Sequence, residues 1–256
     1  MSGRVITFVN QKGGVGKTTT AVSVAAALGR RNQRVLLVDL DPQANATSAA
    51  GASGHGRPGV YEAILSEAAT ESCVVAVPAE RIDVLPSSPS LAGAEVELVP
   101  LMARERRLAN ALQSVRPKYD YILIDCPPSL GLLTINALTA ADCVVIPVQC
   151  EYMALEGLSR LIDTLDLVRR NLNPSLFILG VVLTMFDART RLASQVVDEV
   201  RSHFHQAFAT LIPRSVRLGE APSHGQSIFV YEPGGKAAQA YEALADELLA
   251  RTGVSV

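Results

Sequence analysis

A glycine-rich segment near the start of the chain, NQKGGVGKTTT at residues 10–20, follows an apolar run and precedes a helical pattern. Gly13, Gly14 and Gly16 allow the backbone to curl so that consecutive N–H groups point at one anion. A helix that begins directly after this turn adds the positive end of its dipole. A strand, a glycine-rich turn and a helix start in this order predict a phosphate-binding loop.

Two side chains next to the glycines suit a nucleoside triphosphate with its metal ion. Lys17 can reach the β- and γ-phosphates, and the hydroxyl of Thr18 can ligate Mg²⁺. The segment departs from the common GxxxxGK[ST] loop, because Gln11 replaces the first glycine and Lys12 is added at the entrance. We therefore predict an Mg²⁺–ATP site formed by Lys12, Gly13, Gly14, Val15, Gly16, Lys17, Thr18 and Thr19.

Three carboxylates follow predicted strands and belong with this loop. Asp125 ends the apolar run Tyr121–Ile124, at the place where such loops have an acid that holds Mg²⁺ directly or through water. Asp39 and Asp41 follow the run Val35–Val38, and alternation along the chain places both on one face, near the loop. One of the two is suited to orient or deprotonate an attacking water. For Asp39, a role as a helix cap or a surface charge is equally open.

Short apolar runs alternate with helical patterns along the chain, which predicts βαβ units and a mainly parallel twisted sheet with helices on both faces. Ligands of such sheets bind outside the carboxyl ends of the strands. We predict a single-domain α/β P-loop NTPase fold over residues 1–256. The predicted strands are Val5–Val9, Val35–Val38, Ile82–Leu85, Tyr121–Ile124, Cys143–Val148 and Ile178–Leu183. The predicted helices are Thr18–Arg30, Leu91–Arg116, Thr134–Ala140, Leu155–Asn171, Ser194–Phe208 and Lys236–Ala250.

The composition supports one large domain and excludes nucleic-acid binding by bulk charge. Of the 256 residues, 48% are hydrophobic but only 5% are aromatic, so the core must be aliphatic. The net charge is −2, and any contact with nucleic acid must therefore come from a local patch. The four cysteines lack the spacing of a zinc site or a disulfide framework. We expect them to be small buried hydrophobic residues: Cys73, Cys126, Cys143 and Cys150.

The sequence shows no signal for a membrane. The N-terminus lacks signal-peptide architecture, and no apolar stretch reaches the roughly 18 residues of a membrane span. The predicted C-terminal helix carries more acidic than basic residues on its polar face (Glu242, Asp246 and Glu247 against Lys236 and Arg251), which argues against an anchor for anionic lipid. We expect a cytoplasmic protein without membrane association.

At these motifs the sequence resembles the deviant Walker-A ATPases, specifically the ParA/Soj type that segregates chromosomes and plasmids. The resemblance runs the full length and rests on NQKGGVGKTTT, LLVDLDPQANAT, YILIDCPPS, PVQCEYMALEGL, TMFDART and IPRSVRLGEAPSHG, in the family's order. It implies a weak ATPase that uses ATP and Mg²⁺ as a switch. The ATP-bound homodimer binds double-stranded DNA of the nucleoid without sequence preference. Hydrolysis, stimulated by a ParB-like centromere-binding protein, releases it.

The resemblance also implies roles for single residues. Lys12 matches the signature lysine, which reaches the partner subunit's ATP phosphates across a two-fold dimer, and Asp41 matches the acid needed for hydrolysis. Lys17 and Thr18 match the phosphate and Mg²⁺ ligands, and Asp125 matches the Walker-B acid. Further matches are Glu151 for a nucleotide contact across the dimer, Pro213 and Arg214 for the loop beside the adenine, and Arg189 and Arg217 for DNA contacts.

Several alternatives stay open at this point. Arg189 and Arg217 could be ordinary solvated charges, and Glu151 could be an acid favoured by a helix N-terminus. The alternative functions are a membrane-surface positioning ATPase of the MinD kind and a metabolic enzyme of the same superfamily, either an iron–sulfur reductase or an ATP-dependent ligase. Some family members carry an N-terminal DNA-reading domain. Because this chain begins at its first strand, we do not expect sequence-specific operator binding.

Overall fold

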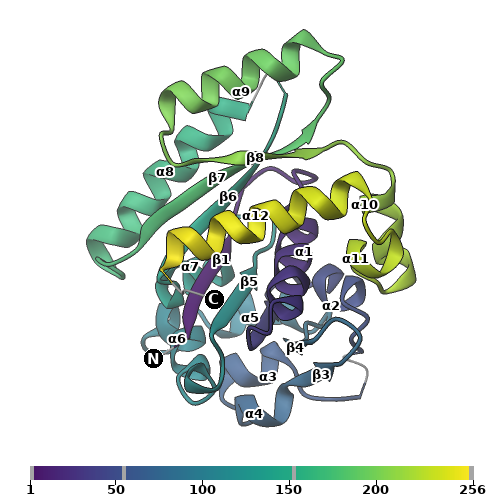
Figure 1. Cartoon of the computed structure of the whole chain (residues 1–256). Coiled ribbons are helices and arrows are strands. Elements are labelled where there is room, and N and C mark those ends of the chain that lie inside the picture. Colours follow the sequence, from purple (N-terminus) through teal and green to yellow (C-terminus); the bar gives the residue numbers. More distant parts are fainter. Residues whose placement is uncertain (1–2, 54–55, 152–153, 254–256) are drawn as a thin grey trace.

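An eight-stranded sheet forms the centre of the molecule (Figure 1). The computed structural model describes residues 3–53, 56–151 and 154–253. The strands are β1 (Arg4–Phe8), β2 (Val35–Asp39), β3 (Val75–Val77), β4 (Ile82–Leu85), β5 (Tyr121–Asp125), β6 (Cys143–Gln149), β7 (Phe177–Phe186) and β8 (Ala207–Pro213). Their order is β3-β4-β2-β5-β1-β6-β7-β8, and only the β3–β4 pair is antiparallel. The predicted mainly parallel α/β sheet is therefore confirmed.

Helices cover both faces of the sheet, which makes the molecule a three-layer α/β structure (Figure 1). Because both faces are covered, the central strands β1, β2 and β5 are almost continuously apolar and buried. One face packs against α1 (Lys17–Arg30), α2 (Asn45–Ala49), α11 (Ile228–Tyr231) and α12 (Lys236–Thr252). The other packs against α3 (Val60–Leu65), α4 (Thr70–Cys73), α5 (Leu91–Glu97), α6 (Arg107–Leu112), α7 (Leu132–Ala140), α8 (Ala154–Asn171) and α9 (Arg191–His203).

The carboxyl ends of the three central strands lie level with one another. Asp125 at the end of β5 pairs in register with Phe8 of β1 on one side and with Asp39 of β2 on the other. The glycine-rich segment follows β1, and Asp41 follows β2. The parallel arrangement therefore brings these segments to one edge of the sheet, as the motifs require.

The predicted single helix Leu91–Arg116 is wrong. The structure has α5, a 3-10 turn η1 (Arg104–Arg106), α6 and a second 3-10 turn η2 (Arg116–Lys118) in its place. Pro100 explains the break, since proline has no N–H to donate and its ring clashes with the preceding helical turn. Ala103 adopts a left-handed backbone with φ 52°, which a continuous helix does not allow.

The predicted helix Ser194–Phe208 is wrong at its C-terminal end. The helix α9 ends at His203, and the chain enters the edge strand β8 at Ala207. Pairing with β7 satisfies the backbone of this segment in the sheet instead of in a helix. Neither β8 nor the short strand β3 was predicted from the sequence. The short helices α2, α3, α4, α10 (Arg217–Glu220), η3 (Ala221–His224) and α11 were not predicted either.

Two further predictions concern the cysteines and the membrane. All four cysteines are buried and free of disulfides, which confirms that they are small core residues. Within the ranges that the structure describes, no helix is long and apolar enough to cross a membrane.

Candidate functional site

The glycine-rich turn between β1 and α1 has the shape of an anion cradle. Gly14 and Gly16 have φ values of 74° and 85°, a left-handed backbone that side-chain-bearing residues rarely adopt. Space around Gly14 is open, since a Cβ there would meet no described atom within 4 Å. Gly16 directly precedes α1 as its N-cap residue, and no side chain caps the helix at that point. The first N–H groups of α1 are therefore free to bind an anion.

Two buried polar side chains hold this turn, and neither was predicted from the sequence. The Asn10 amide donates to the carbonyl of Pro147 at 2.8 Å, and its Oδ1 accepts the N–H of Lys12 at 3.0 Å. The Thr184 hydroxyl donates to the carbonyl of Val15 at 2.8 Å. Both are polar residues at the ends of apolar runs, which was the available signal. Only the sheet order brings β6 and β7 next to the turn.

Lys17 lies under the turn with its side chain almost completely buried. Its Nζ donates to the carbonyl of Lys12 at 3.1 Å, and the residue is 6% exposed. Burial lowers the pKa of Lys17, while the nearby carboxylates of Asp125 and Asp41 raise it in opposition. The structure thus brings the predicted phosphate-binding lysine and both predicted acids into one electrostatic site.

Asp125 is fully buried at the end of β5. Neither carboxylate oxygen accepts a hydrogen bond from the residues that the structure describes. Burial raises the pKa of Asp125 well above its usual range, and the carboxylate of Asp39 adds to this shift. The Thr18 hydroxyl, which is near but outside hydrogen-bonding geometry, and Lys17 lower the pKa. A buried carboxylate is costly without a partner, and a divalent cation would supply one. The donor set of Thr18 and Asp125 therefore fits Mg²⁺.

Side chains of the described residues do not by themselves supply a full set of metal ligands near Thr18 and Asp125. Among the described residues, no group of three or more His, Cys, Asp or Glu side chains is arranged to hold a metal ion. Mg²⁺ is usually bound by one or two protein ligands together with phosphate oxygens and water. The arrangement is therefore suited to a metal that arrives with a phosphate ligand.

Asp39 and Asp41 differ in their surroundings. Asp41 is 7% exposed just past β2, and its Oδ1 accepts the N–H of Gln43 at 3.0 Å. Asp39 is fully buried and accepts both the N–H and the hydroxyl of Thr47 at 2.7 Å. Burial raises the pKa of Asp39 to about 6, although these hydrogen bonds oppose the shift. Asp39 is therefore not a surface charge. It accepts hydrogen bonds from Thr47 in the first turn of α2, although the N-cap residue of that helix is Ala44.

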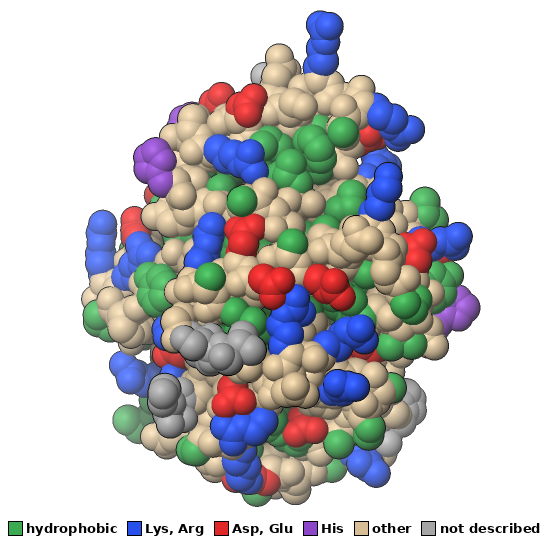
Figure 2. Space-filling view, in the orientation of Figure 1, with side chains coloured by type: hydrophobic (Ala, Val, Ile, Leu, Met, Phe, Trp, Pro, Cys, Tyr) green, Lys and Arg blue, Asp and Glu red, His purple; other side chains and the backbone are tan. Residues whose placement is uncertain are grey.

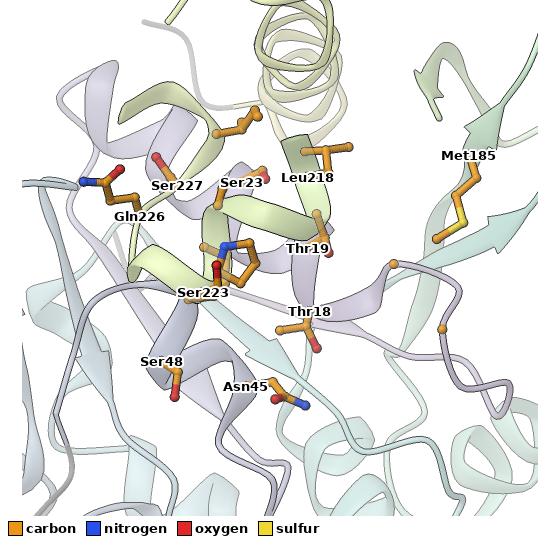
Figure 3. A pocket seen from close by; sticks show the side chains of 17 residues that line it. Thr18, Thr19, Ser23, Asn45, Ser48, Met185, Leu218, Ser223, Gln226 and Ser227 are labelled. Carbon is orange, nitrogen blue, oxygen red and sulfur yellow. The ribbon is translucent and has the colours of Figure 1, made fainter. Parts of the chain in front are cut away.

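Two adjoining cavities open around the start of α1. The first has a volume of about 520 Å³ and lies between α1, α2 and η3. Figure 3 shows Thr18 and Thr19 above Asn45, with Ser223 beside them. The second has a volume of about 350 Å³, and Pro213 and Arg214 line it. The predicted adenine loop is therefore placed next to the phosphate loop. Both cavities share Gly16, Thr19, Met185 and Leu218.

Lys12 and Glu151 meet at the rim of the loop. The Nζ of Lys12 lies 3.1 Å from Oε2 of Glu151, and the two side chains are 45% and 50% exposed. Glu151 precedes α8, which begins at Ala154. Tyr152 and Met153 of the motif quoted above lie outside the described residues. The structure thus joins the two residues that resemblance assigns to the dimer, and it joins them within one chain.

Arg189 and Arg217 lie on the surface and pair with neighbouring acids. Arg189 makes a two-point ion pair with Asp187, with an Nη2–Oδ2 distance of 2.7 Å, and its side chain is 87% exposed. Arg217 lies 2.8 Å from Glu220 and 3.7 Å from Glu232. Neither arginine lines the two cavities at the loop. They are accessible to a large partner.

Comparison with known proteins agrees with this geometry. Residues 3–178 match the family model of an AAA domain. The sporulation initiation inhibitor protein Soj of Bacillus subtilis is 54% identical over 250 residues, which cover 97% of this chain and 99% of that protein. The chromosome partitioning protein ParA of Myxococcus xanthus is 52% identical over 251 residues, which cover 97% of this chain and 89% of that protein.

A solved structure adds ligands to the comparison. Cobyrinic acid a,c-diamide synthase from Mycobacterium smegmatis, with a bound ATP analogue and magnesium, matches with a TM-score of 0.86 and 37% identity. The match covers 98% of this chain and 96% of that chain. Identity to the partition proteins is higher and extends over nearly the whole sequence. The chain therefore belongs to the Soj/ParA family of chromosome-partitioning ATPases.

Proposed function

We propose that this ATPase is a dimerising switch for DNA segregation. With ATP it forms a homodimer that binds double-stranded DNA of the nucleoid without sequence preference. Hydrolysis is slow in the protein alone, and a ParB-like centromere-binding protein accelerates it and releases the dimer. The observation that carries the proposal is the site at the carboxyl ends of the strands, where open N–H groups, buried Lys17 and the unpartnered acid Asp125 meet. The protein acts in the cytoplasm.

The loop supports a specific way of holding ATP. Lys17 now donates to a neutral backbone carbonyl, and a phosphate oxygen would give it a stronger charge-assisted bond. Thr18 and Asp125 would hold Mg²⁺, which neutralises charge on the terminal phosphates when bound. The 350 Å³ cavity at Pro213 and Arg214 is large enough for a base and opens beside Thr19. Asp41 is then the acid that orients the attacking water.

The ion pair of Lys12 explains how ATP could control dimerisation. An exposed pair such as Lys12–Glu151 contributes about 1 kcal/mol or less, so Lys12 can exchange this partner for a phosphate. Two ATP molecules that face each other across a dimer bring about eight negative charges together, and a lysine from each subunit compensates part of them. ATP would therefore act as the ligand that joins the subunits.

DNA binding would depend on the dimer because the single chain has a slight net negative charge and offers DNA only local basic side chains. The net charge is −2, and on the face in Figure 2 basic and acidic side chains are interspersed. Arg189 and Arg217 are exposed, and their surface ion pairs are weak enough to open. A two-fold dimer presents four such arginines to one duplex.

The test is the polarisation of a random-sequence duplex against salt, with an ATP analogue, with ADP and without nucleotide. Four neutralised phosphates predict a slope of log affinity against log salt near −3.6, which is 4 times −0.9. We expect binding only with the analogue. Arg189→Glu or Arg217→Glu should abolish it while dimerisation with ATP survives. Equal affinity in all three states, or a slope unchanged by both charge reversals, would overturn the proposal.

Two other functions have weaker support. Ligase activity would follow the synthase match, but that protein is 37% identical, against 54% and 52% for the partition proteins. A MinD-like membrane role would need a basic amphipathic helix, and α12 carries Glu242, Asp246 and Glu247. Pelleting with anionic liposomes and with DNA, each in the presence of ATP, separates the membrane role from the DNA role.

A further inference from the structure

A closed ring of buried hydrogen bonds surrounds the backbone of Asp41. The carboxylate of Asp39 accepts the N–H of Asp41 at 3.2 Å and the hydroxyl of Thr47 at 2.7 Å. The same hydroxyl accepts the N–H of Ser87 at 3.0 Å. The Ser87 hydroxyl donates to the carbonyl of Asp41 at 2.7 Å, which closes the ring. All four residues are buried, with exposures of 7% or less.

The ring joins three segments that are far apart in the sequence. Asp39 ends β2 and Asp41 lies just past it, Thr47 lies in α2, and Ser87 follows β4. β2 and β4 are neighbours, and Val38 pairs with Leu85. Ser87 therefore lies two residues beyond this pair, beside the chain that carries Asp41. No local sequence pattern predicts this contact.

The ring does more than anchor α2. The bond from Thr47 to Asp39 would be sufficient to hold the first turn of that helix. Ser87 adds a donor to the carbonyl of Asp41 itself, and Asp39 accepts its N–H, so both polar groups of the Asp41 peptide backbone are fixed. A buried hydroxyl is costly unless it is hydrogen-bonded, and the hydroxyl of Thr47 is used both as donor and as acceptor.

We propose that Thr47 and Ser87 are positioning residues that hold Asp41 in place for ATP hydrolysis. The inference rests on the proposed role of Asp41 in hydrolysis. A side chain that orients water must be held to a fraction of an ångström, and a misplacement of about 1 Å can cost a factor of about 10² in rate. The expected defect is therefore in turnover and not in the binding of ATP, since Thr47 and Ser87 do not line the second cavity and lie outside the phosphate loop.

The experiment measures the single-turnover hydrolysis rate and the affinity for an ATP analogue in four variants. Ser87→Ala and Thr47→Val remove one hydroxyl each, and we expect turnover to fall about 10- to 100-fold with affinity unchanged within about twofold. Thr47→Ser keeps the hydroxyl and should restore most of the rate even if Thr47→Val folds poorly. Ser90→Ala is the control, because Ser90 is exposed in the same loop and its side chain caps no helix.

A double-mutant cycle with Asp41→Ala separates this inference from the proposed function. If Ser87 acts through Asp41, adding Ser87→Ala to Asp41→Ala lowers the rate no further. If Ser87→Ala lowers the hydrolysis rate as much in Asp41→Ala as in the wild type, the inference is overturned and the proposed function is not. Wild-type hydrolysis by Asp41→Ala would overturn the role of Asp41, and the inference with it. Equal losses of affinity and turnover in Ser87→Ala, or no recovery in Thr47→Ser, would also overturn the inference.

Discussion

At the scale of single residues, the site depends on charges that are buried together. Lys17 and Asp125 each lose hydration on folding. Burial lowers the pKa of Lys17 and raises the pKa of Asp125, so that it favours the neutral form of both groups. The attraction between the two groups opposes these shifts, because each favours the charged form of the other. An anionic ligand and a cation that arrive together would satisfy both groups. The isolated protein therefore holds charges whose best partners belong to the ligand.

Lys17→Ala should abolish useful binding of ATP. Lys17 is the buried lysine beneath the loop, and a charge-assisted contact in such a shielded site contributes about 2–5 kcal/mol. We expect the dissociation constant to rise at least 30-fold in a direct titration with a fluorescent ATP analogue. Lys118→Ala is the matched control, because Lys118 precedes β5 at the opposite end of the sheet. Unchanged affinity in Lys17→Ala would contradict the assignment.

Asp39 should make the protein less stable as the pH rises. Its pKa is raised to about 6 in the folded state, so the folded state holds a proton that the unfolded chain releases near pH 4. The free energy of unfolding should therefore fall between about pH 4 and pH 6, by up to about 3 kcal/mol.

Asp39→Asn, which has no charge, tests this prediction by urea unfolding at pH 4 and pH 7. From pH 4 to pH 7, the free energy of unfolding of the variant should rise relative to that of the wild type by up to about 3 kcal/mol. The variant also relieves Asp125 of a neighbouring charge, which acts in the same direction. A stability difference that does not change with pH would contradict the shifted pKa.

At the scale of elements, α1 lies close to the β3–β4 turn because Gly29, near the C-terminal end of the helix, has no side chain. A Cβ at Gly29 would lie 2.5 Å from the carbonyl oxygen of Arg81 and 3.0 Å from that of Glu80. These are backbone atoms, and Arg81 already has a left-handed φ of 57°. The C-terminal end of α1 therefore cannot accept a larger residue without moving the turn.

Two glycine substitutions in helices should have opposite effects. Gly29→Ala should lower the free energy of unfolding by about 1–3 kcal/mol, because the added methyl group meets rigid backbone. Gly157→Ala in α8 is the matched control, since a Cβ there meets no described atom within 4 Å. It should raise stability by about 0.5–1 kcal/mol through helix propensity. Urea unfolding measures both, and an increase in both variants would contradict the close contact at Gly29.

At the scale of the whole molecule, the exposed lysine of the loop is the residue that the proposed dimer needs. Lys12→Ala should leave the monomer able to bind ATP, because Lys17, Thr18 and Asp125 remain. Size-exclusion chromatography with a non-hydrolysable ATP analogue should then show no dimer. Lys118→Ala removes the same charge at the far end of the sheet and should still dimerise. A dimer of Lys12→Ala would assign subunit contact to other residues.

Local sequence patterns were sufficient to predict the fold class, the family and the position of the glycine-rich loop. The apolar runs of β1, β2 and β5 and the glycines before Lys17 are local patterns. Their physical meaning depends on neighbours within a few residues. Asp39 shows the limit of that information. Its position after β2 is visible in the sequence, but its role in holding α2 follows from Thr47, eight residues away.

Which distant residues meet at the site followed from the tertiary fold and not from local patterns. The contacts of Thr184 with the loop and of Ser87 with Asp41 join residues 169 and 46 positions apart. The strand β8 likewise depended on tertiary context, because the sheet offered its backbone a better set of hydrogen bonds than a longer α9. Sheet order fixes such contacts, and sheet order is a property of how the whole chain packs.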